Sequence, residues 1–339
     1  MENKHTAEDL KQMQALPLEA KIQATKRRIR EWYEHFDGMV YVSFSGGKDS
    51  TVLKHIVDSM YSDVPTVFVN TGLEYPEIQK FVREVKDGKY ECFNSDVEII
   101  RPEMRFDEVI KKYGYPVVSK ETSKMVKEAR NAIKKGDRNY YGLQKLEGRL
   151  IDKFGNKSIY NCEKWNFLID SPFLIGYQCC DVMKKRPFHK YEKQSWRKAF
   201  IGTMASESRM RKTQWLKFGC NAFEKKKPSS QPLSFWTEQD VLEYIVKYKV
   251  PYAPIYGDIK EENGKLHTTG ADRTGCIFCM FGCHLEKAPN RFQRLKETHP
   301  KQYEYCINGG EYGEGGNWKP SKEGLGIGKV LDYMGVPYE

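Results

Sequence analysis

Six consecutive residues, Ser45 to Ser50, have the composition of a phosphate-binding loop. They read Ser-Gly-Gly-Lys-Asp-Ser, follow an apolar run at 39–44 that indicates a strand, and precede a helical pattern at 51–57. Two glycines permit a tight turn that brings backbone N–H groups against an anion, the helix points its positive end there, and Lys48 adds a full charge. We interpret the segment as a site for a nucleotide phosphate. A plain glycine turn without a ligand is the alternative.

A set of cysteines forms the second group that could carry chemistry. The chain has nine, and an odd number without an apolar leader argues against a disulfide framework. Cys179 and Cys180 are adjacent, and Cys276 and Cys279 form a Cys-x-x-Cys pair. Four thiolates brought together would select zinc or an iron–sulfur cluster. Adjacent ligands are unusual for structural zinc, so we favour a 4Fe-4S cluster, with Cys283 as a further candidate ligand and inert buried cysteines as the alternative.

The elements that must position these residues follow an alternating pattern. Strands are predicted at 39–44, 64–70, 97–100 and 199–202, and helices at 16–36, 75–85 and 237–245. Such alternation predicts an α/β fold with a parallel sheet flanked by helices and with ligands at the carboxyl ends of the strands. Thr237 is a natural N-cap for the last of these helices.

Composition sets the outer bounds. A chain of 339 residues with 39% hydrophobic and 30% charged residues is an ordinary globular protein. We predict a leading helical segment at 1–36, a nucleotide-binding domain at 37–250 and a C-terminal region at 251–339 that carries the Cys-x-x-Cys pair and a glycine-rich tail. Residues 119–165 are predicted to be a lysine-rich helical insertion, or lid, over the nucleotide, and a solvated surface is the equal alternative for their charges.

Charge and hydropathy bear on location and partners. No apolar leader or stretch of membrane-spanning length is present, which predicts a cytoplasmic protein without a membrane partner. The net charge of +10 gives modest support for an anionic partner such as a nucleotide or a nucleic acid. An oligomer is compatible with the sequence.

The glycine loop resembles the PP-loop of N-type ATP pyrophosphatases. Together with the cysteine pairs, it makes the chain resemble the phosphoadenosine phosphosulfate (PAPS) reductase family, within the adenine nucleotide α-hydrolase superfamily, from roughly residue 39 to residue 283. Five further segments carry this resemblance, namely residues 70–77, 179–187, 202–211, 232–237 and 250–254.

The resemblance implies a set of site residues. Nucleotide contacts are expected from Ser43, Ser45, Gly46, Gly47, Lys48, Asp49, Ser50, Thr71, Gly72 and Gly202. Catalytic roles are expected from Lys48, Asp49, Arg209 and Arg211. Asp49 would help to hold Mg²⁺, a hard cation that prefers oxygen ligands, and ATP would be the nucleotide.

Departures from the family pattern point to one branch. Reductases of the family generally lack the full glycine loop and carry a nucleophilic cysteine in a C-terminal tail, whereas this chain keeps the loop and has no cysteine after Cys306. Met204 replaces an expected arginine. We therefore predict an enzyme that adenylylates an acceptor, with release of pyrophosphate, in sulfur transfer.

Two alternatives and several partners stay open at this point. The first alternative is a sulfonucleotide reductase that makes sulfite with thioredoxin and uses Cys283 or Cys306. The second is a non-catalytic module that binds a nucleotide or a nucleic acid. Candidate partners are an adenine nucleotide, a tRNA or DNA acceptor, and thioredoxin or another donor of sulfur or electrons.

Overall fold

The computed structural model describes residues 3–339, which form two compact units. Unit 1 comprises the residues up to Asn70 together with Glu74–Arg101 and Pro187–Gly275. Unit 2 comprises Thr71–Leu73, Pro102–Arg186 and Cys276–Glu339. Each unit therefore combines stretches that are distant in sequence, whereas the sequence predicted contiguous segments at 1–36, 37–250 and 251–339.

A six-stranded sheet forms the centre of unit 1, in the order β3-β2-β1-β4-β6-β5. All neighbouring pairs are parallel except β5 with β6. The strands are β1 (Val40–Phe44), β2 (Thr66–Val69), β3 (Val97–Ile100), β4 (Lys198–Ile201), β5 (Asn221–Ala222) and β6 (Ser229–Ser230). Val42 of β1 lies opposite Thr66 on one side and Phe200 on the other. The predicted α/β fold class is confirmed.

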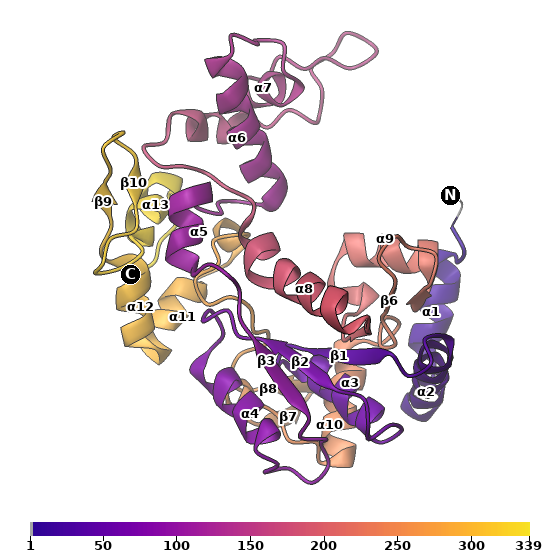
Figure 1. Cartoon of the computed structure of the whole chain (residues 1–339). Helices are drawn as coiled ribbons and strands as arrows, with labels where there is room; N and C mark the ends of the chain where they lie inside the picture. The colour runs from indigo at the N-terminus through magenta and orange to yellow at the C-terminus, as the bar shows by residue number, and fades with distance from the viewer. Residues whose placement is uncertain (1–2) are drawn as a thin grey trace. The chain divides into compact units, whose positions relative to one another are not determined.

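The two faces of this sheet are covered by different helices because side chains alternate along each strand. Val40, Val42 and Phe44 enter the main core, whereas Tyr41 packs on the opposite face with its ring centroid 5.0 Å from that of Tyr191. In Figure 1, α8 (Arg186–Ser195) covers the face of Tyr41, and α3 (Lys48–Asp58), α4 (Pro76–Lys86) and α10 (Glu238–Tyr248) cover the other.

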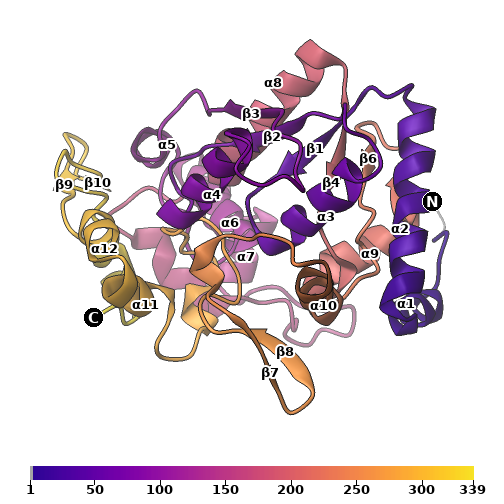
Figure 2. The ribbon, with the colours of Figure 1, turned by 90° about the horizontal axis from the view of Figure 1, so that it is seen from below.

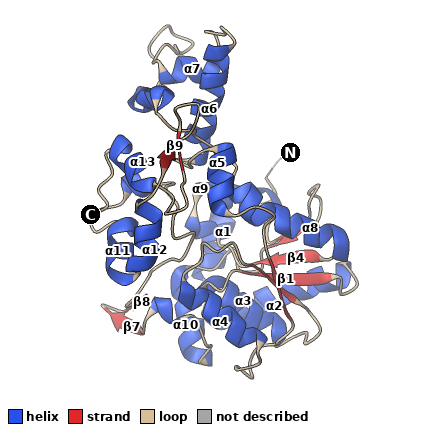
Figure 3. Cartoon of the chain, turned by 60° about the vertical axis from the view of Figure 1, so that its left-hand side comes forward, coloured by secondary structure: helices blue, strands red, loops and turns tan. Residues whose placement is uncertain are grey.

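Strand order places a switch point at the centre of this sheet. From β1 the chain moves outward through β2 to β3, and it returns on the other side of β1 as β4, so β1 and β4 lie side by side (Figure 3). Ligands of open α/β sheets bind outside the carboxyl ends of the strands at such a point. The glycine loop follows β1 directly, which places it at this position.

Further elements complete unit 1. Figure 2 views the face covered by α3 and α10. The remaining elements are α1 (Ala7–Ala15), α2 (Leu18–His35), the 3-10 turns at Ala205–Glu207 and Pro254–Tyr256, α9 (Arg209–Phe218), β7 (Ile259–Glu262) and β8 (Lys265–Thr268). Thr237 caps α10 as predicted, because its side chain accepts a hydrogen bond from the N–H of Asp240.

Unit 2 is mainly helical. Its elements are α5 (Phe106–Tyr113), α6 (Lys120–Lys134), α7 (Tyr141–Leu146), a 3-10 helix at Glu163–Asp170, a π-helical stretch at Asp181–Lys185, a 3-10 turn at Cys283–Leu285, α11 (Arg291–Thr298), α12 (Pro300–Ile307), β9 (Glu311–Tyr312), β10 (Trp318–Lys319) and α13 (Ile327–Met334). Short strands β9 and β10 pair within the glycine-rich tail. No helix among residues 3–339 has the length and apolarity needed to cross a membrane.

Candidate functional site

The glycine loop makes a tight turn between β1 and α3. Gly46 has a φ of +70°, and a Cβ there would lie 2.7 Å from Cγ2 of Ile78, so this position requires glycine. Ser45 Oγ accepts a hydrogen bond from the N–H of Gly47 at 3.3 Å, and Ser50 Oγ donates one to the carbonyl of Gly47 at 2.9 Å. The serine hydroxyls therefore order the turn that presents the N-terminus of α3.

The end of β4 lies against the start of α3. A Cβ on Gly202 would be 2.9 Å from Cα of Ser50 and 3.1 Å from the carbonyl oxygen of Asp49. Glycine is needed there because no side chain fits between the two backbones. This close approach explains physically why the sequence has glycine at the carboxyl end of β4.

A cavity of about 260 Å³ opens at this point of unit 1. Eight residues that the sequence predicted line it, namely Ser43, Ser45, Gly47, Lys48, Asp49, Ser50, Gly202 and Arg211. Polar residues that sequence reasoning missed also line it: Thr203, Glu207, Glu238, Tyr256, Asp272, Arg273 and Thr274. Met204, which replaces the expected arginine, is buried and lines it as well.

Lys48 is the most constrained cation of this cavity. Its side chain is 6% exposed, and its Nζ donates hydrogen bonds to Oε1 of Glu238 at 2.5 Å and to the carbonyl of Asp272 at 2.7 Å. Its backbone N–H donates to the hydroxyl of Tyr256 at 3.3 Å, and that hydroxyl lies 2.6 Å from Oγ1 of Thr274. Burial raises the pKa of Tyr256 to about 12, so the phenol stays protonated at neutral pH.

Asp49 is a half-buried carboxylate with an incomplete set of partners. Its Oδ1 has no hydrogen-bond partner among residues 3–339. Burial raises the pKa of this carboxyl, while the charges of Lys48 and Arg273 oppose the rise. An unsatisfied carboxylate oxygen costs free energy unless a cation or a donor binds it, so its chemistry fits a hard metal ion.

Two arginines add positive charge. Arg211 forms an ion pair with Glu207 and also interacts electrostatically with Asp49. Burial lowers the pKa of Arg211, an effect that the charge of Asp49 opposes. Arg273 lies close enough to Asp49 to lower the pKa of that carboxyl. Lys48, Arg211 and Arg273 thus give the cavity three cationic groups beside the four carboxylates of Asp49, Glu207, Glu238 and Asp272. This mixed set suits a polyanionic ligand that binds together with a metal ion.

Four of the predicted residues do not line this cavity. Gly46 shapes the turn without lining it. Arg209 is exposed at the start of α9 and does not line the cavity. Thr71 and Gly72 belong to unit 2, where the side chain of Thr71 accepts a hydrogen bond from the N–H of Leu73 at 3.1 Å. Roles for Thr71 and Gly72 in nucleotide binding therefore stay predictions.

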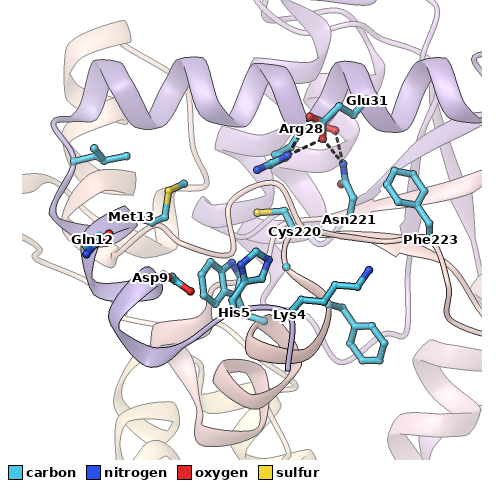
Figure 4. Close-up of a pocket in the computed structure, with 14 residues that line it drawn as sticks. Lys4, His5, Asp9, Gln12, Met13, Arg28, Glu31, Cys220, Asn221 and Phe223 are labelled. Atoms are coloured by element: carbon cyan, nitrogen blue, oxygen red, sulfur yellow. Dashed lines mark hydrogen bonds and ion pairs between the residues drawn. The ribbon is translucent and has the colours of Figure 1, made fainter. Parts of the chain in front are cut away.

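Unit 1 holds a second, larger cavity of about 570 Å³ between its N-terminal helices and α9. Most charged side chains that line it already form ion pairs or hydrogen bonds with other side chains or with the backbone. Arg28 donates to both carboxylate oxygens of Glu31, Asn221 donates to the same carboxylate (Figure 4), and Lys4 pairs with Glu224. Asp9 caps α1 through Thr6. The glycine loop, whose backbone N–H groups suit a phosphate, lines the smaller cavity and not this one, so the smaller cavity is the better nucleotide site.

The four predicted cluster cysteines come together in unit 2. Cys179, Cys180, Cys276 and Cys279 line one small pocket of about 20 Å³ with apolar neighbours such as Phe106 and Met183. Sγ of Cys179 and Sγ of Cys180 are 3.9 Å apart, and the Cys279 N–H donates to the carbonyl of Cys276 at 3.1 Å. No group of three or more His, Cys, Asp or Glu side chains within residues 3–339 forms a metal site in its present geometry.

The electrostatics of these thiols differ from one to the next. The pKa of Cys180 is lowered to about 6 by its hydrogen bond with Cys179 and by nearby lysines, foremost Lys184. The same pairing raises the pKa of Cys179, and burial raises that of Cys279. Cys180 therefore ionises more readily than Cys179 and Cys279, and a metal binds the ionised form of a thiol.

Cys283 and Cys306 occupy different surroundings. Cys283 is buried at the start of a 3-10 turn, does not line the pocket of the other four thiols, and has its pKa raised to about 11 by burial. Cys306 is fully buried within α12, and burial raises its pKa further. Neither thiol has the exposure and low pKa that a nucleophile needs.

Comparisons with known proteins give one family match and two similar proteins. The family model described as the phosphoadenosine phosphosulfate reductase domain matches residues 39–151 and 160–280. An uncharacterized protein of Methanocaldococcus jannaschii is 25% identical over 276 residues, which are 79% of this chain and 42% of that protein, so the chain spans less than half of its length. A crystal structure of PAPS reductase from Candida auris, in complex with phosphate, covers 78% of this chain and 100% of its own, with a TM-score of 0.39 and 15% identity.

Proposed function

Because this chain belongs to the phosphoadenosine phosphosulfate reductase family, a family of PP-loop nucleotide-binding enzymes, we propose that it binds ATP and adenylylates an acceptor for sulfur transfer. An acceptor oxygen attacks the α-phosphorus of ATP, the bond to the β-phosphate oxygen breaks, and pyrophosphate leaves. A sulfur nucleophile supplied by a donor then displaces AMP, so that a carbon–oxygen bond is exchanged for a carbon–sulfur bond.

The observation that carries this proposal is the intact glycine loop beside three cationic side chains in one cavity. Lys48, Arg211 and Arg273 all line it, together with the turn that precedes α3. Pyrophosphate is the most highly charged leaving group in the reaction, and prepositioned donors and cations stabilise charge as it develops. Loop N–H groups at the start of α3 would add to this stabilisation.

Asp49 supports a magnesium-dependent form of the reaction. Its unsatisfied Oδ1 is an oxygen ligand of the kind that Mg²⁺ prefers. Bound Mg²⁺ would neutralise part of the phosphate charge. Asp49 would hold the ion on the protein side, and Lys48 would orient the terminal phosphates.

The four thiols of unit 2 are proposed to hold a 4Fe-4S cluster. Support comes from their convergence on one pocket and from the lowered pKa of Cys180. Such a cluster would supply a redox-active centre that can also bind sulfur. Cys283 is the weaker candidate ligand because it does not line that pocket.

The burial of Cys283 and Cys306 favours adenylylation over the reductase alternative. A sulfonucleotide reductase needs an accessible thiolate to attack the sulfur of its substrate, and both thiols are buried with raised pKa values. Thioredoxin would also have to reach the sulfur of that attacking cysteine in a later step. The burial of both thiols and their raised pKa values therefore weigh against a nucleophilic role for Cys283 or Cys306.

Two parallel reactions with anaerobically purified protein test the proposal. One receives ATP, Mg²⁺ and cellular RNA or DNA, and the other receives PAPS with thioredoxin or a thiol reductant. We expect AMP and pyrophosphate from the first and no sulfite from the second. Sulfite from the second with ATP untouched in the first would establish the reductase instead, and nucleotide binding without any product would indicate a binding module.

A further inference from the structure

One segment of unit 2 carries much of the positive charge of the chain. Residues 119–165, which we call the arm, contain twelve Lys or Arg and six Asp or Glu, a net charge of +6 out of +10 for the whole protein. Several acids of the arm are neutralised within it, since Glu147 pairs with Arg149 and Glu163 pairs with Lys157 at 2.6 Å. Most of the other cations, among them Lys124, Lys134, Lys135 and Lys153, are exposed and form a basic surface.

The base of the arm is firmly anchored. The Arg130 guanidinium on α6 donates hydrogen bonds to the carbonyls of Leu168, Ile169, Ser171 and Phe173 at 2.8–2.9 Å. This arginine is therefore structural and does not contribute to the basic surface. Figure 1 shows α6 and α7 (magenta) together with the loop that follows α7.

Large apolar side chains point into solvent at the tip of the arm, residues 150–160. Ile159 is 90% exposed and Phe154 is 76% exposed, and Ile151 and Tyr160 are each more than half exposed. Tyr141, at the start of α7 and outside the tip, is also more than half exposed. The tip is nevertheless ordered: Asp152 Oδ1 accepts hydrogen bonds from the N–H groups of Phe154 and Asn156, and residue 151 forms an antiparallel bridge with residue 157. A group of exposed apolar side chains on an ordered loop indicates a binding surface.

Cations lie over the exposed rings of the arm. Lys145 Nζ is 5.7 Å from the ring centroid of Tyr141, and Lys153 Nζ is 4.9 Å from that of Phe154. Rings that can stack on bases beside ammonium groups that can bind phosphates are the two components of a surface for single-stranded nucleic acid. A duplex would hide the base faces that such rings need.

Most of the tip lies between the two stretches that the family model matches. The family model matches residues 39–151 and 160–280, so residues 152–159 lie outside it. Phe154 and Ile159, the two most exposed apolar residues of the arm, belong to this unmatched stretch. These two side chains therefore lie outside the part of the chain that the family model describes.

We propose that the arm binds single-stranded nucleic acid, with Phe154 and Tyr160 stacking on bases and Lys145 and Lys153 contacting phosphates. We further infer that the bound strand is the acceptor that is adenylylated, and this part of the inference rests on the proposed function. The binding surface itself is argued from charge and exposure.

The test is fluorescence anisotropy of the full chain with labelled single-stranded RNA and single-stranded DNA of mixed sequence, at several salt concentrations. The double variant Phe154→Ala/Tyr160→Ala should weaken binding by about tenfold or more. Lys153→Ala should lower the salt slope by about 1. Trp196→Ala, a matched change at an aromatic residue of unit 1 that is 74% exposed, should leave binding unchanged. Comparing the affinities for RNA and for DNA identifies which of the two strands the protein prefers.

Two outcomes would overturn the proposal. One is strand binding that the double variant leaves intact. The other is that the unmodified protein does not bind the strands at all but binds anionic vesicles or a protein, and that the double variant loses this binding. Lys48→Ala separates the two proposals, because it should abolish AMP formation and retain strand binding. Strand binding through the arm without AMP formation by the unmodified protein would reject the proposed function alone.

Discussion

Nζ of Lys48 lies 2.5 Å from Oε1 of Glu238, a residue 190 positions later in the chain. A second bond of 2.7 Å joins the same ammonium group to the carbonyl of Asp272. The loop cation is thus held by an acid that a phosphate must displace. Glu238 is the first residue of α10 and is 44% exposed at its side chain, so it can move into solvent when a nucleotide binds.

Glu238→Gln should strengthen nucleotide binding. Removing the competing negative charge frees Lys48 for phosphate, so we expect the KM for ATP to fall several-fold, as measured by pyrophosphate release. Glu243→Gln, at an exposed position of the same helix, is the matched control and should leave the KM unchanged. A higher KM would mean that Glu238 positions Lys48 for binding rather than competing with the ligand.

Lys48→Ala should reduce pyrophosphate release by a factor of about 100 or more, because it removes a prepositioned cation from the leaving group. Visible absorbance of the proposed cluster should stay unchanged, since its four proposed ligands belong to unit 2. Lys287→Ala, at an exposed lysine, provides the control. Unchanged turnover in the Lys48 variant would reject the proposed role of the loop.

Asp49→Asn should abolish Mg²⁺-dependent activity and raise the free energy of unfolding of the ligand-free protein. Burial raises the folded-state pKa of Asp49 above its unfolded value, so its ionised form destabilises the folded state as pH rises through the folded-state pKa. The gain from the variant should therefore be largest at neutral pH and should shrink in acid. Thermal unfolding at a series of pH values measures it, and equal gains at every pH would contradict the assigned cause.

Cys276→Ser and Cys279→Ser should each remove or strongly reduce the absorbance and iron content of anaerobically purified protein, because each takes away one of four proposed thiolate ligands. Cys92→Ser, at an exposed cysteine of unit 1, should leave both unchanged. If elemental analysis finds zinc in place of iron, the four thiols still form a metal site, but the proposed 4Fe-4S cofactor is wrong.

Arg130→Lys should lower the free energy of unfolding by about 2 kcal/mol or more, because a lysine cannot reproduce the planar fork that bonds four carbonyls. Arg138→Lys is the matched control on the same arm. Arg138 is largely exposed and makes a single long ion pair of 3.7 Å with Glu147, so the change should stay within about 0.5 kcal/mol. Chemical denaturation measures both variants, and equal losses would reject the anchoring role of Arg130.

Local signals in the sequence were sufficient for the sheet and for the loop. The apolar run before Ser45, the glycine pair and the cap at Thr237 each act within a few residues, and β1, α3 and α10 form where those signals predicted them. Eight of the predicted site residues also converge on one cavity, because the carboxyl ends of parallel strands meet at the same edge of a sheet.

Other contacts could not be predicted, because they join residues far apart in the chain. Glu238 appeared only as an acid in the first turn of a helix, which the helix dipole alone explains. Asp272, Arg273 and Thr274 carry no motif. Arg209 and Arg211 looked equivalent in sequence, yet two residues along a helix turn the side chain to another face, and Arg211 alone lines the cavity.

By itself, the sequence determined the fold class, the turn at Gly46 and the residue types available for phosphate and sulfur chemistry, because these depend on periodicity and on short-range backbone geometry. Tertiary structure decided which cations line the cavity, that Lys48 is held by Glu238, that two distant cysteine pairs meet, and that Cys283 and Cys306 are buried. Those outcomes depend on packing between segments that are remote in sequence, which no local pattern encodes.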